Sequence, residues 1–271
     1  MTDHDCITFL QDTLPRLRLL WPGFRKVRRQ VCKRLQRRLR ELDLPDLAAY
    51  RAYLDTYPAE WPVLDSLCRI SISRFYRDRA VFDRLRDAVL PALAGEALDR
   101  EEPTVRCWSV GCASGEEPYT LQLLWQFAVQ PHFPQVACHI LATDADPHLL
   151  ARAAAGCYSA GSLRELPQEW RNAAFMPQDD GYCLRSRFRQ GVDFEQQDIR
   201  TAAPDSIFDL ILCRNMVFTY FDEPSQQQTL ARILERLRPG GVLVIGQNEQ
   251  MPAESYELEP WDAHLRLYRR Q

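Results

Sequence analysis

Small residues and carboxylates directly follow the clearest predicted strand of this sequence. Residues 104–110 (TVRCWSV) predict a buried strand, and residues 111–115 (GCASG) come next. Small side chains let a ligand approach backbone amides, and the N-terminus of the following helix adds N–H donors. Glu116 and Glu117 follow without the lysine of a phosphate-binding loop, which favours a ligand carrying a cationic amino group. These residues alone leave a ligand site and a structural turn equally open.

A further carboxylate ends the next predicted strand. Residues 136–143 (VACHILAT) predict this strand, and Asp144 follows it, 33 residues after Gly111. Ligands of α/β folds bind at the carboxyl ends of parallel strands, where a carboxylate accepts the ribose hydroxyls of an adenosine cofactor. A helix cap in the turn 144–147 is the alternative. Together with the glycine-containing turn, Asp144 favours ribose binding.

Two more segments combine polar and aromatic residues. The predicted strand 208–213 (FDLILC) ends in Arg214-Asn215, and Tyr220 lies in the aromatic cluster that follows. This arrangement frames a pocket with one hydroxyl, or else it is ordinary strand-to-helix packing. Residues 71–78 (SISRFYRD) lie where two parts of the chain join, and surface ion pairing is the default explanation for their arginines.

The elements that position these residues alternate between strand and helix from residue 104 onward. This alternation predicts a mostly parallel, Rossmann-like sheet covered on both faces. Asp180-Gly181 predicts a hairpin turn, and therefore a small antiparallel β-insert at about 172–192. The remaining expected elements are a strand over 241–245 and helices over 118–127, 147–155 and 224–236.

The first 65 residues predict helices. Residues 24–44 carry an apolar stripe at helical spacing, and residues 47–56 predict a second helix. A helix over 79–90 is expected to stop near Pro91, with a loop over 94–103.

The net charge of −3 conceals two oppositely charged parts. Residues 1–80 carry +6 and residues 81–271 carry −9, and residues 25–40 hold nine basic side chains and no acid. Three interpretations of the basic helix stay open: a solvated face, a docking surface for an acidic protein segment, and, least favoured, nucleic-acid binding.

Composition excludes several classes of protein. With 271 residues, 46% hydrophobic and 26% charged, the chain is neither disordered nor membrane-inserted, because no apolar run approaches the roughly 20 residues of a membrane span. The acidic N-terminus lacks the basic region of a secretory signal, which indicates a cytoplasmic protein. The nine cysteines form no C-x-x-C and are expected to be reduced core residues, and the five histidines show no zinc spacing, so no metal is expected.

Taken together, five segments resemble the CheR family, the chemotaxis-receptor glutamate methyltransferases that use S-adenosylmethionine. The resemblance extends from about residue 24 to about residue 249. It implies a helical N-terminal domain (1–70), a linker with an active-site arginine (71–95), and a class I methyltransferase domain with a β-insert (96–271). The segments are SISRFYRD (71–78), WSVGCASGEEPY (108–119), ATDAD (142–146), FDLILCRNMVFTYFDEP (208–224) and RPGGVLVIGQNE (238–249).

The resemblance also implies the roles of individual residues. Arg77 matches the arginine beside the methyl donor, and Tyr220 the tyrosine near the sulfonium, with one residue more between Asn215 and Tyr220 than is common in the family. The cofactor-binding positions implied are Ser71, Ser73, Arg77, Gly111, Glu117, Asp144, Asp198, Ile199, Arg214 and Asn215. Ser71, Ser73 and Asp198 stand where the family has asparagine, threonine and asparagine.

The expected function is transfer of a methyl group from S-adenosylmethionine to a protein glutamate carboxylate, leaving S-adenosylhomocysteine. A carboxylate nucleophile needs no general base, which fits motifs without a histidine. Two alternatives remain: a methyltransferase of the same fold that acts on a small molecule or a thiol, and a regulatory module that binds the cofactor without turnover. The sequence makes no prediction of the oligomeric state.

Overall fold

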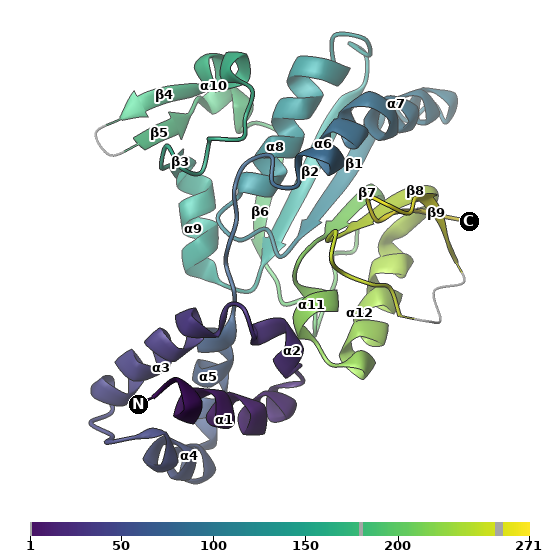
Figure 1. Ribbon diagram of the computed structural model, residues 1–271. Helices are drawn as coiled ribbons and strands as arrows, with labels where there is room; N and C mark the ends of the chain where they lie inside the picture. The colour runs from purple at the N-terminus through teal and green to yellow at the C-terminus, as the bar shows by residue number, and fades with distance from the viewer. Residues whose placement is uncertain (1, 179–180, 253–256) are drawn as a thin grey trace. The chain divides into compact units, whose positions relative to one another are not determined.

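The computed structural model describes residues 2–178, 181–252 and 257–271. The chain forms two compact units (Figure 1). The first comprises residues 1–70 and 216–226, and the second comprises residues 71–215 and 227–271, so the expected linker 71–95 lies in the second unit. No helix in the described ranges is long and apolar enough to cross a membrane.

The first unit is helical. Its longest helix, α3, buries Val31, Leu35 and Leu39 along one stripe, as the spacing predicts. The helix begins at Arg28 rather than at Phe24, because residues 21–24 form a separate turn of helix whose Phe24 is buried. The helices of this unit are α1 (Asp3–Thr13), α2 (Trp21–Phe24), α3 (Arg28–Glu41), α4 (Leu47–Thr56), α5 (Trp61–Cys68) and α11 (Val217–Tyr220).

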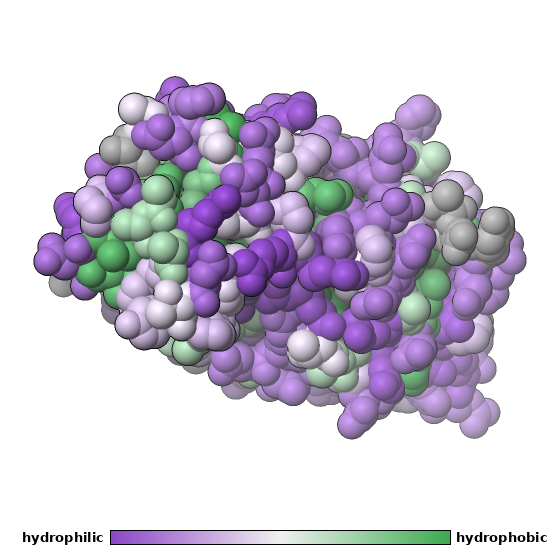
Figure 2. All heavy atoms as spheres, turned by 90° about the horizontal axis from the view of Figure 1, so that it is seen from below, coloured by the Kyte–Doolittle hydropathy of each residue, from purple (hydrophilic) through white to green (hydrophobic). Residues whose placement is uncertain are grey.

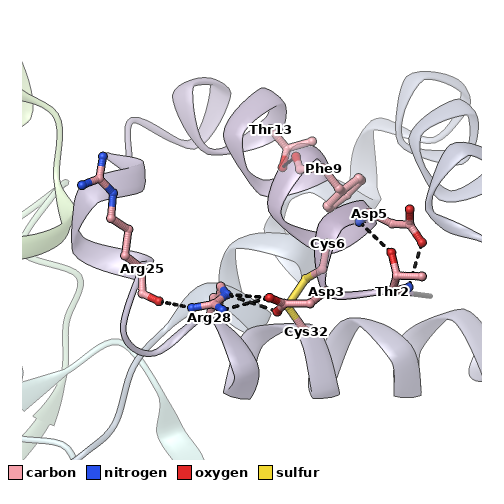
Figure 3. Close-up of a disulfide and its surroundings, with 9 residues drawn as sticks. All are labelled: Thr2, Asp3, Asp5, Cys6, Phe9, Thr13, Arg25, Arg28 and Cys32. Carbon is pink, nitrogen blue, oxygen red and sulfur yellow. Dashed lines mark hydrogen bonds and ion pairs between the residues drawn. A yellow bond between two sulfur atoms is a disulfide. The ribbon is translucent and has the colours of Figure 1, made fainter.

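A disulfide between Cys6 and Cys32 joins α1 to α3 (Figure 3). A second disulfide joins Cys157 to Cys183. The expectation that all cysteines are reduced is therefore wrong for these four. The two cysteines of each pair are 26 residues apart in the sequence, and the fold brings them within bonding distance. The five free cysteines are buried, as expected for small core residues.

The second unit is built on a seven-stranded sheet of order β6-β2-β1-β7-β8-β10-β9. The first five of these strands pair in parallel, and β10 is antiparallel to both β8 and β9. This is the expected Rossmann-like methyltransferase sheet. The strands are β1 (Thr104–Val110), β2 (Ala137–Asp144), β6 (Val192–Gln196), β7 (Phe208–Cys213), β8 (Leu237–Ile245), β9 (Leu258–Asp262) and β10 (Leu267–Arg270).

The helix expected to stop at Pro91 instead continues to Asp99. Between α6 (Arg79–Arg84) and α7 (Leu90–Asp99) the backbone widens into a π-helical turn over Leu85–Val89. Proline has no N–H, so it cannot make the regular hydrogen bond to the residue four positions earlier. Pro91 is accommodated because it lies at the start of α7, directly after the wider π-helical turn. The expected loop over 94–103 is accordingly reduced to its last four residues.

Further helices and a small second sheet complete the second unit (Figure 1). The small sheet has the order β3-β5-β4 and is antiparallel throughout, as the expected β-insert requires. Asp180 of the expected hairpin turn lies outside the described residues. The elements are α8 (Glu116–Leu124), α9 (Pro147–Ala155), α10 (Gln168–Ala174), β3 (Cys157–Tyr158), β4 (Phe175–Gln178), β5 (Gly181–Leu184) and α12 (Glu223–Arg236), the first four residues of which belong to the first unit.

Candidate cofactor and methyl-transfer site

Three parallel strands end side by side and bring the polar segments together. In the register of the sheet, Val110 of β1 lies beside Thr143 of β2, and Ser109 lies beside Leu212 of β7. The turns after these strands therefore share one edge of the sheet, where α/β folds bind ligands. The amides of Gly111 and Cys112 both donate to the Thr143 carbonyl, at 2.8 and 3.0 Å, which ties the first turn to the end of β2.

The 111–115 turn depends on its small residues. Gly111, Ala113 and Gly115 all have positive φ, at 70°, 48° and 90°. A Cβ on Gly115 would lie 2.9 Å from the Cβ of Ala153, so α9 packs against this turn at a distance that only glycine permits. The side chain of Glu116 is buried and accepts hydrogen bonds from Ser114, at 3.0 and 3.2 Å. The turn is thus fixed from both sides before α8 begins.

The Asp144 carboxylate is oriented by backbone donors. One oxygen accepts the amide of Ala113 at 2.9 Å, and the other accepts the amide of Asp146 at 2.9 Å. Asp144 is half-buried and stands at the end of β2, as predicted. The amide of Ala113 thereby links Asp144 directly to the glycine-containing turn.

Arg214 is the centre of an ionic network that joins three motifs. Its side chain is 2% exposed and donates to Glu117 at 2.9 Å and to Asp78 at 2.6 Å. It also donates to the backbone carbonyl of Arg77, at 3.1 Å. The other oxygen of Glu117 accepts the Ser109 hydroxyl at 2.8 Å. Residues 77–78, 117 and 214, which are far apart in the sequence, are therefore joined in one group of ion pairs and hydrogen bonds.

Arg77 itself closes a tight turn. Its guanidinium donates to the Ile72 carbonyl at 2.6 Å, so the segment between them folds back on itself. Phe75 and Tyr76 of this segment are fully buried, and their amides donate to the Ser162 carbonyl and the Thr120 hydroxyl. The half-buried Arg77 is thus held on a segment anchored in the second unit.

Asn215 is held by a carboxylate that the sequence did not single out. Its backbone adopts φ of 57°, and its amide donates to Glu249 at 2.8 Å. Glu249 is 2% exposed and also accepts the amide of Gly246 at 2.6 Å. Glu249 and Asp78 both lie within the motifs that carry the family resemblance. The signal that could have revealed Asp78 is its place directly after Arg77, and for Glu249 it is a carboxylate shortly after a predicted strand.

The remaining predicted positions lie in the same unit, except for Tyr220. Asp198 follows β6 and its carboxylate pairs with Arg200 at 2.6 Å, while the neighbouring Ile199 is buried. Ser71 and Ser73 are half-buried on the extended segment before Phe75. Tyr220 ends α11 in the first unit, where its ring packs on Phe24 with centroids 5.0 Å apart.

Cys112 is not a nucleophile in this site. Burial raises the pKa of its thiol well above the ordinary value, and the charges of Asp144 and Glu117 raise it further. The thiol is therefore neutral at physiological pH, and only the thiolate is reactive.

The Arg214 network has one further donor to offer to a ligand. Within the described part of the chain, the Nε of Arg214 is buried and has no hydrogen-bond acceptor. A buried donor of this kind costs about 1–3 kcal/mol until it is satisfied, and a ligand carboxylate is an acceptor suited to it.

Comparison with known proteins agrees with this geometry. Residues 71–264 match the family model described as CheR methyltransferase, SAM binding domain. The chemotaxis protein methyltransferase of Listeria monocytogenes is 38% identical over 69% of this chain and 68% of its own length. The chemotaxis protein methyltransferase 2 of Vibrio cholerae is 32% identical, over 82% and 77%. The corresponding protein of Borreliella burgdorferi is 28% identical, over 90% and 89%. The chain therefore belongs to the CheR family of S-adenosylmethionine-dependent methyltransferases.

Proposed function

We propose that this enzyme methylates glutamate carboxylates of a chemotaxis receptor. The family membership supplies the cofactor and the reaction class, and relatives with more than 30% identity, those of Listeria monocytogenes and Vibrio cholerae among them, are named chemotaxis protein methyltransferases. The observation that supports the proposal is the Arg214 network, in which one guanidinium contacts Glu117, Asp78 and the backbone carbonyl of Arg77. A guanidinium is suited to hold an acceptor carboxylate through two parallel hydrogen bonds.

The cofactor's parts are assigned to residues by their chemistry. Asp144 would accept hydrogen bonds from the ribose hydroxyls, while Glu117 and Arg214 would hold the methionyl amino and carboxylate groups. Asp198 and Ile199 border the adenine. The polar Ser71 and Ser73 complete the cofactor site together with Gly111 and Asn215. The bound cofactor supplies an electrophilic methyl group on a positively charged sulfur.

Arg77 and Tyr220 act on the reacting groups. The acceptor carboxylate is already ionised at neutral pH, so no side chain has to remove a proton. Positive charge disperses as the methyl group moves, and the protein's task is to hold the carboxylate in line with it. Alignment of this kind contributes about 7–11 kcal/mol in model reactions. Arg77 orients the carboxylate, and Tyr220 shapes the space around the methyl group.

The first unit offers a basic surface for an acidic receptor segment. On and before α3, Arg28 pairs with Asp3 at 2.8 Å and Arg38 pairs with Glu60 at 2.8 Å. Exposed cations accompany them at Arg25, Lys26, Arg29 and Lys33. The face drawn in Figure 2 is mostly hydrophilic, with hydrophobic patches among the hydrophilic side chains.

Charge reversal tests the docking surface. Arg29→Glu combined with Lys33→Glu should raise KM for the receptor and leave kcat unchanged, because rim charges act on encounter. Added salt should raise KM of the wild type in the same direction. Equal response to an acidic peptide and to duplex DNA would contradict a protein partner.

The reaction itself is tested with tritiated S-adenosylmethionine and a receptor cytoplasmic segment. Methyl esters release tritiated methanol in alkali, whereas N-methyl and S-methyl products do not, so alkaline release identifies the acceptor as a carboxylate. Arg77→Ala should lower kcat about 100-fold, the size expected for a misaligned reactant, with binding of S-adenosylhomocysteine retained. Arg79→Ala is the matched control, because Arg79 is exposed and donates to the Glu165 carbonyl.

The sequence-based expectation of a cytoplasmic enzyme is kept in this proposal. Disulfides are uncommon in reducing compartments, and this chain pairs four cysteines. The redox state should therefore be held fixed in each assay. If the protein binds the cofactor tightly but shows no turnover with any acceptor, this result would instead favour a regulatory module.

A further inference from the structure

The segment after the Asn215 turn is built into the helical unit. Residues 216–226 belong to the compact unit formed by residues 1–70, although the chain on either side of them belongs to the other unit. Leu19 and Phe221 form an antiparallel β-bridge. The amide of Leu20 donates to the Tyr220 carbonyl at 2.7 Å, and the amide of Asp222 donates to the Arg18 carbonyl at 2.9 Å. Two backbone hydrogen bonds therefore fix Tyr220 from both sides.

Side chains add to this attachment. The guanidinium of Arg18 lies 2.9 Å from the Asp222 carboxylate. The ring of Phe24 is 1% exposed and contacts the Tyr220 ring at a centroid distance of 5.0 Å, with the planes tilted by 58°. Tilted aromatic pairs at this distance are favourable beyond the burial of their surface. Phe24 therefore constrains the ring of Tyr220, while the backbone bonds constrain its position.

Gly23 lets the two segments approach closely. A Cβ at this position would lie 2.2 Å from the Thr219 carbonyl oxygen and 3.0 Å from a ring carbon of Tyr220. Ordinary contact begins near 3.4 Å, so an alanine would displace the 219–220 backbone by about 1 Å. The φ of Gly23 lies outside the positive range that side chains avoid, and the constraint is therefore one of space alone.

From these contacts we infer that Gly23 and Phe24 are positioning residues for Tyr220 in methyl transfer. The inference rests on the proposed role of Tyr220 and extends it. Residues 18–24 then affect turnover through the placement of the Tyr220 ring, and a change in this segment should act on kcat.

A double-mutant cycle on the full-length enzyme tests this inference. Gly23→Ala should lower kcat about 100-fold, as a displacement of about 1 Å in an aligned site does, with affinity for S-adenosylhomocysteine retained. In a Tyr220→Ala background the same substitution should lower kcat by less than about threefold, because residues that act together are not additive. Gly95→Ala is the matched control, since a Cβ at Gly95 meets nothing within 4 Å.

An equal loss from Gly23→Ala in both backgrounds would overturn the inference. Phe24→Leu provides a second route if Gly23→Ala does not fold, and it should show the same dependence on Tyr220. Hydrogen exchange gives a readout without turnover: the amides of Leu20 and Asp222 should exchange faster in Gly23→Ala and remain as in the wild type in Gly95→Ala. Unchanged exchange also overturns the inference. If the wild-type enzyme forms no methyl esters, the proposed function is refuted. Hydrogen exchange at the amides of Leu20 and Asp222 still tests whether Gly23 positions the segment that carries Tyr220.

Discussion

Asp78 provides a test of how the network around Arg214 supports the site. Its carboxylate lies 2.6 Å from the guanidinium of Arg214, whose side chain is 2% exposed. Glu117 is the second carboxylate that pairs with this guanidinium. Asp78→Asn keeps the shape of the side chain and removes its charge. Because a hydrogen bond to a charged group contributes about 1.5–3 kcal/mol, we expect the free energy of unfolding to fall by about 2 kcal/mol. Arg214 stays compensated by Glu117, so the loss should not reach that of an unpaired buried charge.

The backbone at Asp78 adds a second, separable contribution. Its φ is 63°, in the left-handed region that asparagine and aspartate tolerate better than alanine. Asp78→Ala should therefore lose about 1 kcal/mol more than Asp78→Asn. Asp78→Gly should recover that difference, because glycine has no Cβ to clash.

The assay is urea unfolding of each variant, followed by kcat and the affinity for S-adenosylhomocysteine. Asp87→Asn is the matched control: Asp87 also lies 2.6 Å from an arginine, Arg86, but its side chain is 60% exposed. An exposed pair contributes about 0–1 kcal/mol. Asp78→Asn should lower kcat as well, because Arg214 also holds the Arg77 carbonyl. A stability loss no larger than that of Asp87→Asn would refute the reasoning, and equal stability of the alanine and asparagine variants would refute the backbone contribution.

Three further predictions concern stability, pH and cofactor binding. Reducing the Cys6–Cys32 disulfide, which spans 26 residues, should lower the free energy of unfolding by about 3.5 kcal/mol in urea titrations. In a Cys6→Ala/Cys32→Ala variant, dithiothreitol should leave the stability of the first unit unchanged. Arg38 lowers the pKa of Glu60 below the ordinary 4.5, so the ion pair between them stabilises the fold fully above about pH 4.5. This stabilisation is lost as the pH falls through the lowered pKa, and the urea midpoint of Glu60→Gln should vary less than that of the wild type over this pH range. Gly115→Ala, at φ of 90° and 2.9 Å from Ala153, should weaken binding of S-adenosylhomocysteine in calorimetry, and wild-type affinity would contradict the fit of the turn.

Local pattern was enough to predict the elements that carry the site. Residues 47–56, 147–155 and 208–213 have the predicted bounds, because apolar spacing and caps such as Asp46 act within a few residues. Asp144 could be placed at a strand end for the same reason. The fold class followed from the alternation of strands and helices, which the sheet order confirms.

Local pattern failed where a distant contact or a backbone irregularity decided the outcome. The helix through Pro91 depends on a π-helical turn, for which the apolar spacing carries no signal. The cysteine pairs depend on where α1 meets α3 and where β3 meets β5, so spacing along the chain could not reveal them.

The sequence by itself determined the family, the cofactor class and the identities of the residues at three strand ends. Only the tertiary structure decided which of these residues act as one group. Arg214 meets Asp78 and Glu117 across more than 90 residues of chain, and Tyr220 is fixed by Gly23 and Phe24. The physical reason is that ion pairing and packing depend on distances in space, which residue types and periodicity specify only after the sheet register and the helix contacts are set.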